Sequence, residues 1–181
     1  MDAAARAAPS VGGALRLFVR QPLTRSGPEH RDIVQAVVDL ARTPGVAPGP
    51  VDLLPYRHAH HAGTFKDAFT QETGTPFTPA AFRAWRLAML DSADAMLVVR
   101  TELSESGAYE IAYNVHAGPA VPVFFAVHTS CPITTTLLRD LEPLVDAHYA
   151  QFADPAELTG PLRDFLAKCP RHTPLAEGIP R

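Results

Sequence analysis

The chain has 181 residues, of which 46% are hydrophobic and 19% charged, and this suits one compact domain with a sizeable core. Its formal net charge is −3, and its only lysines, Lys66 and Lys168, lie far apart in the sequence. Because basic residues form no cluster, we expect neither a nucleic-acid polymer nor a membrane surface as a partner, and a small ligand instead.

The first residues of the chain and its two cysteines indicate the cellular compartment in which we expect the protein. Residues 1–13 carry an acid and lack a continuous apolar run, so they predict a disordered lead and not a signal peptide or a membrane span. Cys131 and Cys169 have neither disulfide nor metal-binding spacing. We therefore expect a cytoplasmic protein that contains no metal and no other cofactor.

The first predicted elements are a strand, a helix and a second strand. Residues 15–19 are rich in strand formers and lead into a loop that contains Pro22. Pro28 suits the first position of a helix, and apolar residues then recur on one face until Pro44. Residues 51–54 form a short second strand.

The segment from residue 55 to 78 is polar and contains no clear periodicity, so we expect an irregular lid or binding loop. Thr78 and Pro79 then predict a helix start, with threonine as the N-cap and proline at the first helical position. Five large apolar residues extend this helix to Asp91: Phe82, Trp85, Leu87, Met89 and Leu90.

Strands and helices continue to alternate in the second half of the chain. The predicted elements are a strand at 95–100, a helix from 104 to a C-cap at Gly118, a strand at 121–127, a helix at 134–144, an edge strand at 148–152 and a helix at 155–168. This order predicts a single α/β domain over residues 14–169, followed by a tail at 170–181. Its fold class is a doubly wound, Rossmann-like (flavodoxin-like) parallel sheet of about five strands with helices on both faces.

The turn from the strand at 95–100 into the next helix carries the main candidate site. Ser104, Ser106 and Gly107 lie where unpaired backbone N–H groups and the helix dipole favour a phosphate or a carboxylate. Glu110 lies four residues after Ser106, on the same face, at the sheet edge where ligands bind in open α/β folds. The alternatives are an ordinary helix cap and a glutamate that only suits the helix dipole.

This stretch resembles the nucleoside 2-deoxyribosyltransferase superfamily, and within it the 2'-deoxynucleoside 5'-phosphate N-hydrolases and the CMP N-glycosidases. The resemblance covers residues 14–168 and rests mainly on Asp94 before the strand, on Ser104 six residues before Glu110, and on Gly107. It implies that Glu110 is the catalytic carboxylate and that Ser104 contacts the 5'-phosphate of the substrate. It also implies a homodimer or a larger homo-oligomer.

The chain departs from this family at two places. The loop after the first strand usually contains a glycine, and here it begins Arg20-Gln21-Pro22. Many members have an aspartate, which protonates the leaving base, where this chain has Arg86. Arginine cannot act as a general acid, so either another residue donates the proton or Arg86 binds an anionic leaving group. A purely structural alternative is that Arg86 pairs with Asp91 or Glu105.

Other residues are candidates for contacts with the substrate. Arg20 and Arg25 follow the first strand and would bind phosphate oxygens through a guanidinium fork, or would be solvated. Trp85 and Tyr109 would stack on a base, or would lie in the core.

The irregular segment contains three histidines, His58, His60 and His61. Their spacing is not that of a helix-borne pair of metal ligands, and no cysteine lies nearby to complete a set. The functional interpretation is a lid in which one of them, with His58 as the first candidate, protonates the leaving base. The alternative is a set of exposed histidines without such a role.

Cleavage of an N-glycosidic bond builds positive charge on the sugar and negative charge on the base, so the site needs an anion under C1' and a donor near the base. Glu110 can supply the anion, and together with the resemblance this predicts an N-glycosidase that hydrolyses a nucleoside 5'-monophosphate or a modified nucleoside through Glu110. One alternative is a deoxyribosyltransferase that exchanges bases. Another, from a different class, is a nucleotide-binding protein of the same fold that has lost turnover.

Overall fold

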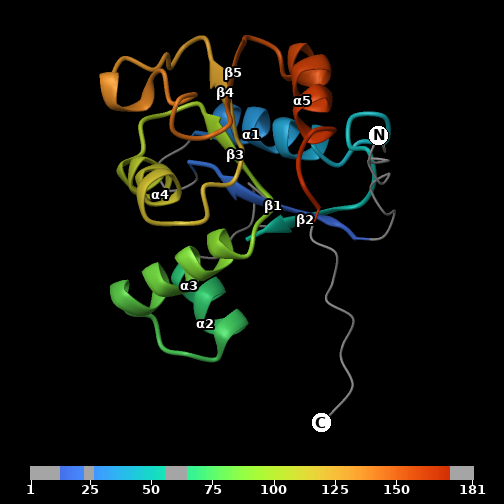
Figure 1. Ribbon diagram of the computed structural model, residues 1–181. Coiled ribbons are helices and arrows are strands. Elements are labelled where there is room, and N and C mark those ends of the chain that lie inside the picture. Colours follow the sequence, from blue (N-terminus) through green and yellow to red (C-terminus); the bar gives the residue numbers. More distant parts are fainter. Residues whose placement is uncertain (1–12, 23–26, 56–64, 172–181) are drawn as a thin grey trace, which may run out of the picture.

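The computed structural model describes residues 13–22, 27–55 and 65–171. Within them, five parallel strands form one sheet in the order β2-β1-β3-β4-β5 (Figure 1). The strands are β1 (Leu15–Arg20), β2 (Val51–Leu54), β3 (Ala95–Arg100), β4 (Val123–His128) and β5 (Ala147–Phe152). This is the flavodoxin-like order, in which the winding reverses between β1 and β3. The predicted fold class is confirmed.

Five α-helices and two 3-10 turns connect or follow these strands in the described part of the chain. They are α1 (Pro28–Leu40), α2 (Phe65–Thr73), α3 (Pro79–Asp91), α4 (Glu105–His116), η1 (Thr136–Leu138), η2 (Pro155–Leu158) and α5 (Thr159–Leu166). The start of α3 is as predicted, because the Thr78 hydroxyl accepts a hydrogen bond from the Ala81 N–H at 3.1 Å. No helix in these residues is both long and apolar enough to cross a bilayer.

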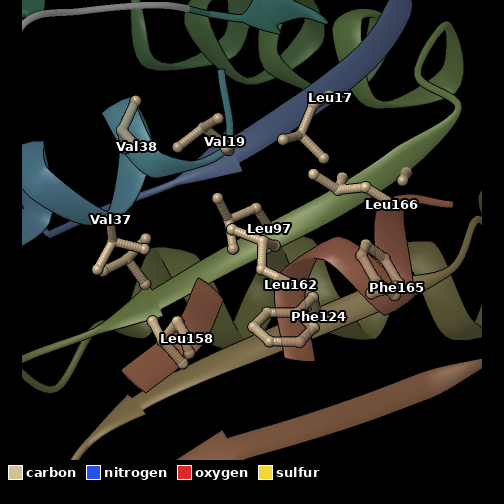
Figure 2. Packing of buried hydrophobic residues seen from close by; sticks show 14 of the residues in the cluster. Leu17, Val19, Val37, Val38, Leu97, Phe124, Leu158, Leu162, Phe165 and Leu166 are labelled. Carbon is tan, nitrogen blue, oxygen red and sulfur yellow. The ribbon is translucent and has the colours of Figure 1, made fainter. Parts of the chain in front are cut away.

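The alternation of side chains along β1 divides the core into two layers. Leu17 and Val19 lie on the face covered by α1 and by the η2–α5 segment, whereas Phe18 lies on the opposite face with residues of α3 and α4. Both faces of the sheet are therefore covered, which explains why β3 is a continuous apolar run. Figure 2 shows the first layer, in which Leu17, Val19, Leu97 and Phe124 meet Val37, Val38, Leu158, Leu162, Phe165 and Leu166.

The predicted helix at 134–144 is wrong. Only η1 is helical there, and the rest is a loop that covers the second face with buried Leu141 and Val145. The physical reason is local: Thr134 to Thr136 are β-branched, and Asp140 has a left-handed φ of 52°. Arg139 stabilises the loop by donating to the carbonyls of Ile133 and Thr134.

The expectation of irregular structure at 55–78 is wrong for residues 65–73, which form α2. Phe69 is buried on this helix, one turn after Phe65. Gly74 ends the helix in the left-handed region, with φ 65°, and donates its N–H to the Thr70 carbonyl.

Two helix ends differ from those predicted. The predicted helix at 155–168 is divided into η2 and α5 and ends at Leu166. The predicted C-cap, Gly118, follows α4 without a left-handed φ. A Cβ at that position would lie 2.7 Å from the Tyr113 ring, so Gly118 is required by a close approach and not by its dihedral angles.

Candidate active site

A cavity of about 360 Å³ opens at the carboxyl end of β1, next to the point where the winding of the sheet reverses. Four aromatic side chains from α2, α3 and the turn between them line one part of it: Phe65, Phe77, Phe82 and Trp85. Polar side chains from β1, α3 and α4 line the other part: Arg20, Arg86, Ser106 and Glu110. In open α/β sheets this edge is where ligands bind.

Glu110 lies on the second turn of α4 and is only 5% exposed. Arg86 of α3 holds both of its carboxylate oxygens, with Nε donating to Oε1 at 2.7 Å and Nη2 to Oε2 at 3.0 Å. The guanidinium also lies over the ring of Phe18, 4.5 Å from its centroid. A bidentate fork of this kind fixes the orientation of the carboxylate more strongly than a single contact does.

Arg20, the last residue of β1, brings a second guanidinium to the same carboxylate. Its Nε lies 3.4 Å from Oε2 of Glu110, while its Nη2 donates to the hydroxyl of Ser104. Burial lowers the pKa of Arg20; the Glu110 carboxylate opposes this shift, and the positive charge of Arg86 adds to it.

Ser104 caps α4, as the cap interpretation of this serine expected. Its Oγ accepts the N–H of Gly107 at 3.1 Å as well as the Nη2 group of Arg20. With both acceptor positions used, the Ser104 hydroxyl is left with its proton to donate. Its contact with a substrate phosphate stays a prediction.

Gly107 provides the space in which Arg20 lies. A Cβ on this glycine would be 3.1 Å from Nε of Arg20 and 3.4 Å from Oγ of Ser104. A residue with a side chain here would therefore require Arg20 to shift by a few tenths of an ångström.

Ser106 and Glu110 line the same cavity, in agreement with the prediction that they share a face of the helix. Ser106 also borders an open pocket at the start of α4 that contains Arg20 together with Glu102 and Glu105. Two acids beside one arginine make that pocket less favourable for a phosphate than the aromatic-lined cavity, where arginines outnumber acids.

Trp85 and Tyr109 lie in different places. Trp85 is partly buried in the aromatic wall and meets Phe69 edge to face, with centroids 5.5 Å apart. Tyr109 is 53% exposed, so the alternative that it belongs to the core is wrong. It lines a separate pocket between α3 and α4 that adjoins the cavity through Arg86 and Glu110.

The predicted structural partners of Arg86 are wrong. Asp91 accepts a hydrogen bond from the Tyr113 hydroxyl at 2.9 Å, and Arg86 pairs with Glu110 instead. Four other candidate residues from the sequence analysis lie outside the described residues: Arg25, His58, His60 and His61. Within the described ranges, no three His, Cys, Asp or Glu side chains gather closely enough to hold a metal ion.

Trp85 was a candidate for stacking on a base, but the other three rings of the aromatic wall were not predicted as part of the site. Phe65 lies 5.3 Å from Phe82 and 5.5 Å from Phe77, and Phe82 lies 5.6 Å from Trp85, measured between ring centroids. The helix with Phe82 and Trp85 was predicted, and the helical spacing of Phe65 and Phe69 could have revealed a second apolar helix face before the third strand.

No protein-family model matches this chain, and no curated protein matches it in sequence. Among solved structures, the CMP N-glycosidase BcmB of Clostridium botulinum is similar to it, with a TM-score of 0.51 and 13% sequence identity. The match covers 83% of this chain and 99% of that chain. At this identity the likeness concerns the fold alone, to which this chain has a distant structural similarity.

Proposed function

We propose that the protein is an N-glycosidase that hydrolyses a nucleoside 5'-monophosphate or a modified nucleoside, with Glu110 as its catalytic carboxylate. The observation that carries the proposal is a buried carboxylate that lines a cavity together with aromatic side chains, at the sheet edge where ligands bind. The likeness of the fold to a CMP N-glycosidase supports it.

The two parts of the cavity match the two parts of such a substrate. A planar base can stack on the face of one aromatic side chain of this wall, such as Phe82 or Trp85, and stacking of this kind contributes about 1–3 kcal/mol per base. The sugar and its phosphate then lie toward the polar residues, where Glu110 reaches C1' and the arginines reach the phosphate.

The carboxylate has two ways to act. As a nucleophile, a Glu110 oxygen bonds to C1' while the C1'–N bond breaks and its electron pair leaves with the base. Water then bonds to C1', the ester oxygen returns to Glu110 as a carboxylate oxygen, and the water proton passes to solvent. As a base, Glu110 instead takes the proton from water while that water attacks C1' directly.

The departing base needs either a proton or a positive charge beside it. A histidine of the 58–61 segment is the proposed proton donor. The competing proposal is that Arg86 stabilises an anionic leaving group without proton transfer, since arginine stays charged. If a second base replaces water as the acceptor, the same steps give a deoxyribosyltransferase.

One observation favours a second candidate function, that of a nucleotide-binding protein without turnover. Arg86 engages both oxygens of Glu110, which lowers the capacity of that carboxylate to attack C1' or to take a proton. A ligand would then occupy the cavity without reacting.

Incubation with a panel of nucleoside 5'-monophosphates, nucleosides and deoxynucleosides separates the two functions. The glycosidase proposal requires free base, measured by chromatography, from at least one member of the panel. If no base is released while a nucleotide still raises the melting temperature, the protein is a binding module and the glycosidase proposal is wrong.

A further inference from the structure

The cavity contains more positive than negative charge. Among the described residues that line it, Arg20 and Arg86 are cationic and Glu110 is the single acid. The side chains of the arginines are 18% and 11% exposed, and that of Glu110 is 7% exposed. Buried charges are costly unless they are paired, and one carboxylate cannot neutralise two guanidinium groups. The site therefore favours the arrival of a further anion.

The hydrogen-bond donors show the same imbalance. Arg86 already engages both oxygens of Glu110. Nε of Arg20 is buried and lies 3.4 Å from Oε2, but its geometry does not make a hydrogen bond. A phosphate or carboxylate of a ligand would bring the acceptor oxygens that this pair of arginines lacks.

We infer that Arg86 is a specificity-determining residue: an anionic group of the ligand, phosphate or carboxylate, displaces Glu110 from the guanidinium fork and takes its place. Only hydrogen bonds and ion pairs are exchanged, and no covalent bond changes. A neutral nucleoside offers nothing to exchange, so the site selects against it. The inference rests on the proposed function in one respect, since the exchange leaves Glu110 free to act at C1'.

The exchange makes Glu110 an internal competitor of the ligand for Arg86. Glu110→Gln keeps the shape of the side chain but removes its charge. We therefore expect this variant to bind anionic ligands more tightly, by roughly tenfold or more, which is the effect of one hydrogen bond to a charged group. Its affinity for a neutral nucleoside should stay unchanged. Arg86→Gln should weaken binding of the anion. The double variant should no longer bind the anion more tightly than the wild type does.

The test is calorimetric titration of the full chain with probes that contain no cleavable N-glycosidic bond. Pseudouridine 5'-monophosphate carries its anion on the sugar, orotate carries a carboxylate on the base, and pseudouridine is neutral. The probe that binds Glu110→Gln more tightly than the wild type identifies the part of the ligand, sugar or base, that carries the anion. Glu142→Gln and Arg163→Gln are matched controls, because both side chains are exposed and line none of the pockets around the site. Neither control should change any affinity by more than about twofold.

The inference is overturned if Glu110→Gln leaves the affinity for both anionic probes unchanged or lowers it. Should Glu110→Gln fail to fold, Arg86→Gln decides: it must lower the affinity for an anion by roughly tenfold without affecting pseudouridine, and an unchanged affinity rejects the inference. Base release from CMP is scored separately. Release without the gain in affinity rejects the exchange alone, whereas the gain without release rejects the glycosidase alone.

Discussion

Gly107 is the residue on which the position of Arg20 depends. It lies in the first turn of α4, and an added Cβ would come within 3.1 Å of Nε of Arg20. The helix itself would accept alanine, which has the better helix propensity by about 1 kcal/mol. The glycine therefore suits the position of Arg20 and not the stability of the helix.

We expect Gly107→Ala to lower turnover and nucleotide affinity by about tenfold, because Arg20 must move, while the free energy of unfolding changes by less than about 1 kcal/mol. Enzyme assays and urea unfolding measure the two effects. Gly160→Ala in α5 is the matched control, since its Cβ would meet nothing within 4 Å, and it should raise stability without affecting activity. Wild-type turnover in Gly107→Ala would contradict this role.

At the residue scale, the sequence predicted the contacts within one helix better than those between helices. The serine cap and the shared face of Ser106 and Glu110 follow from helical spacing, and both are present. The pairing of Arg86 with Glu110 joins residues 24 positions apart on two helices, and it depends on how α3 packs against α4. No local pattern contains that information.

Asn114 determines how α4 is fixed to the sheet. It is fully buried, its Nδ2 donates to the Val121 carbonyl at 3.0 Å, and its Oδ1 accepts the Val121 N–H at 3.1 Å. These bonds tie the last turn of α4 to the residues before β4. Glu110 lies one turn earlier on the same helix, so this connection also positions the site.

We expect Asn114→Ala to lower the free energy of unfolding by about 2–4 kcal/mol, because two backbone groups of Val121 lose their buried partner. Urea unfolding measures the change. Gln71→Ala, which removes an exposed helical amide, is the control and should stay within about 0.5 kcal/mol of wild type. A loss in Asn114→Ala as small as that of the control would mean that α4 is fixed by other contacts.

At the element scale, prediction succeeded where a cap defines the start of a helix. It failed where packing against the rest of the molecule determines the conformation of a segment. Thr78 and Pro79 define the start of α3 locally, and the structure agrees. Residues 134–144 contain enough leucine to suggest a helix, yet three consecutive threonines and Pro143 oppose one. The loop instead buries Leu141 and Val145 against the sheet, which periodicity does not reveal.

At the scale of the whole molecule, the two free cysteines differ in accessibility. Cys169 is 8% exposed within the first core layer, and burial raises the pKa of its thiol to about 12, with smaller contributions from Asp146 and Asp94. Cys131 is partly exposed. Because the thiolate is the reactive form, Cys169 is protected twice, by burial and by protonation.

We expect a thiol reagent at pH 8 to modify Cys131 in the folded protein and Cys169 only on unfolding, as absorbance of the released chromophore would show. Since the folded pKa of Cys169 lies above its ordinary value of 9.0, its contribution to stability is complete below pH 9 and is lost as the pH rises toward 12. Cys131→Ser should abolish the rapid reaction. Rapid modification of both thiols in the folded state would show that this core layer opens readily.

The homodimer stays a prediction, and α3 gives it physical support. Phe82, Trp85, Leu87 and Met89 are only partly covered, and Leu90 alone among the residues of this helix is buried. A helix that covers one side of a sheet needs less apolar surface than this. Light scattering should give at least twice the 19.5 kDa mass of one chain, and a monomer at micromolar concentration would contradict the prediction.

The most direct test of the proposed activity is the release of free base from CMP and related nucleotides by the wild type, by Glu110→Gln and by Glu105→Gln. If Glu110 acts at C1', its replacement should lower turnover by about three orders of magnitude or more, because its role is chemical and not one of packing. Glu105, which is exposed on the same helix, should be replaceable without loss. Turnover in Glu110→Gln within about tenfold of wild type, or no base release by the wild type from any nucleotide, would contradict the assignment.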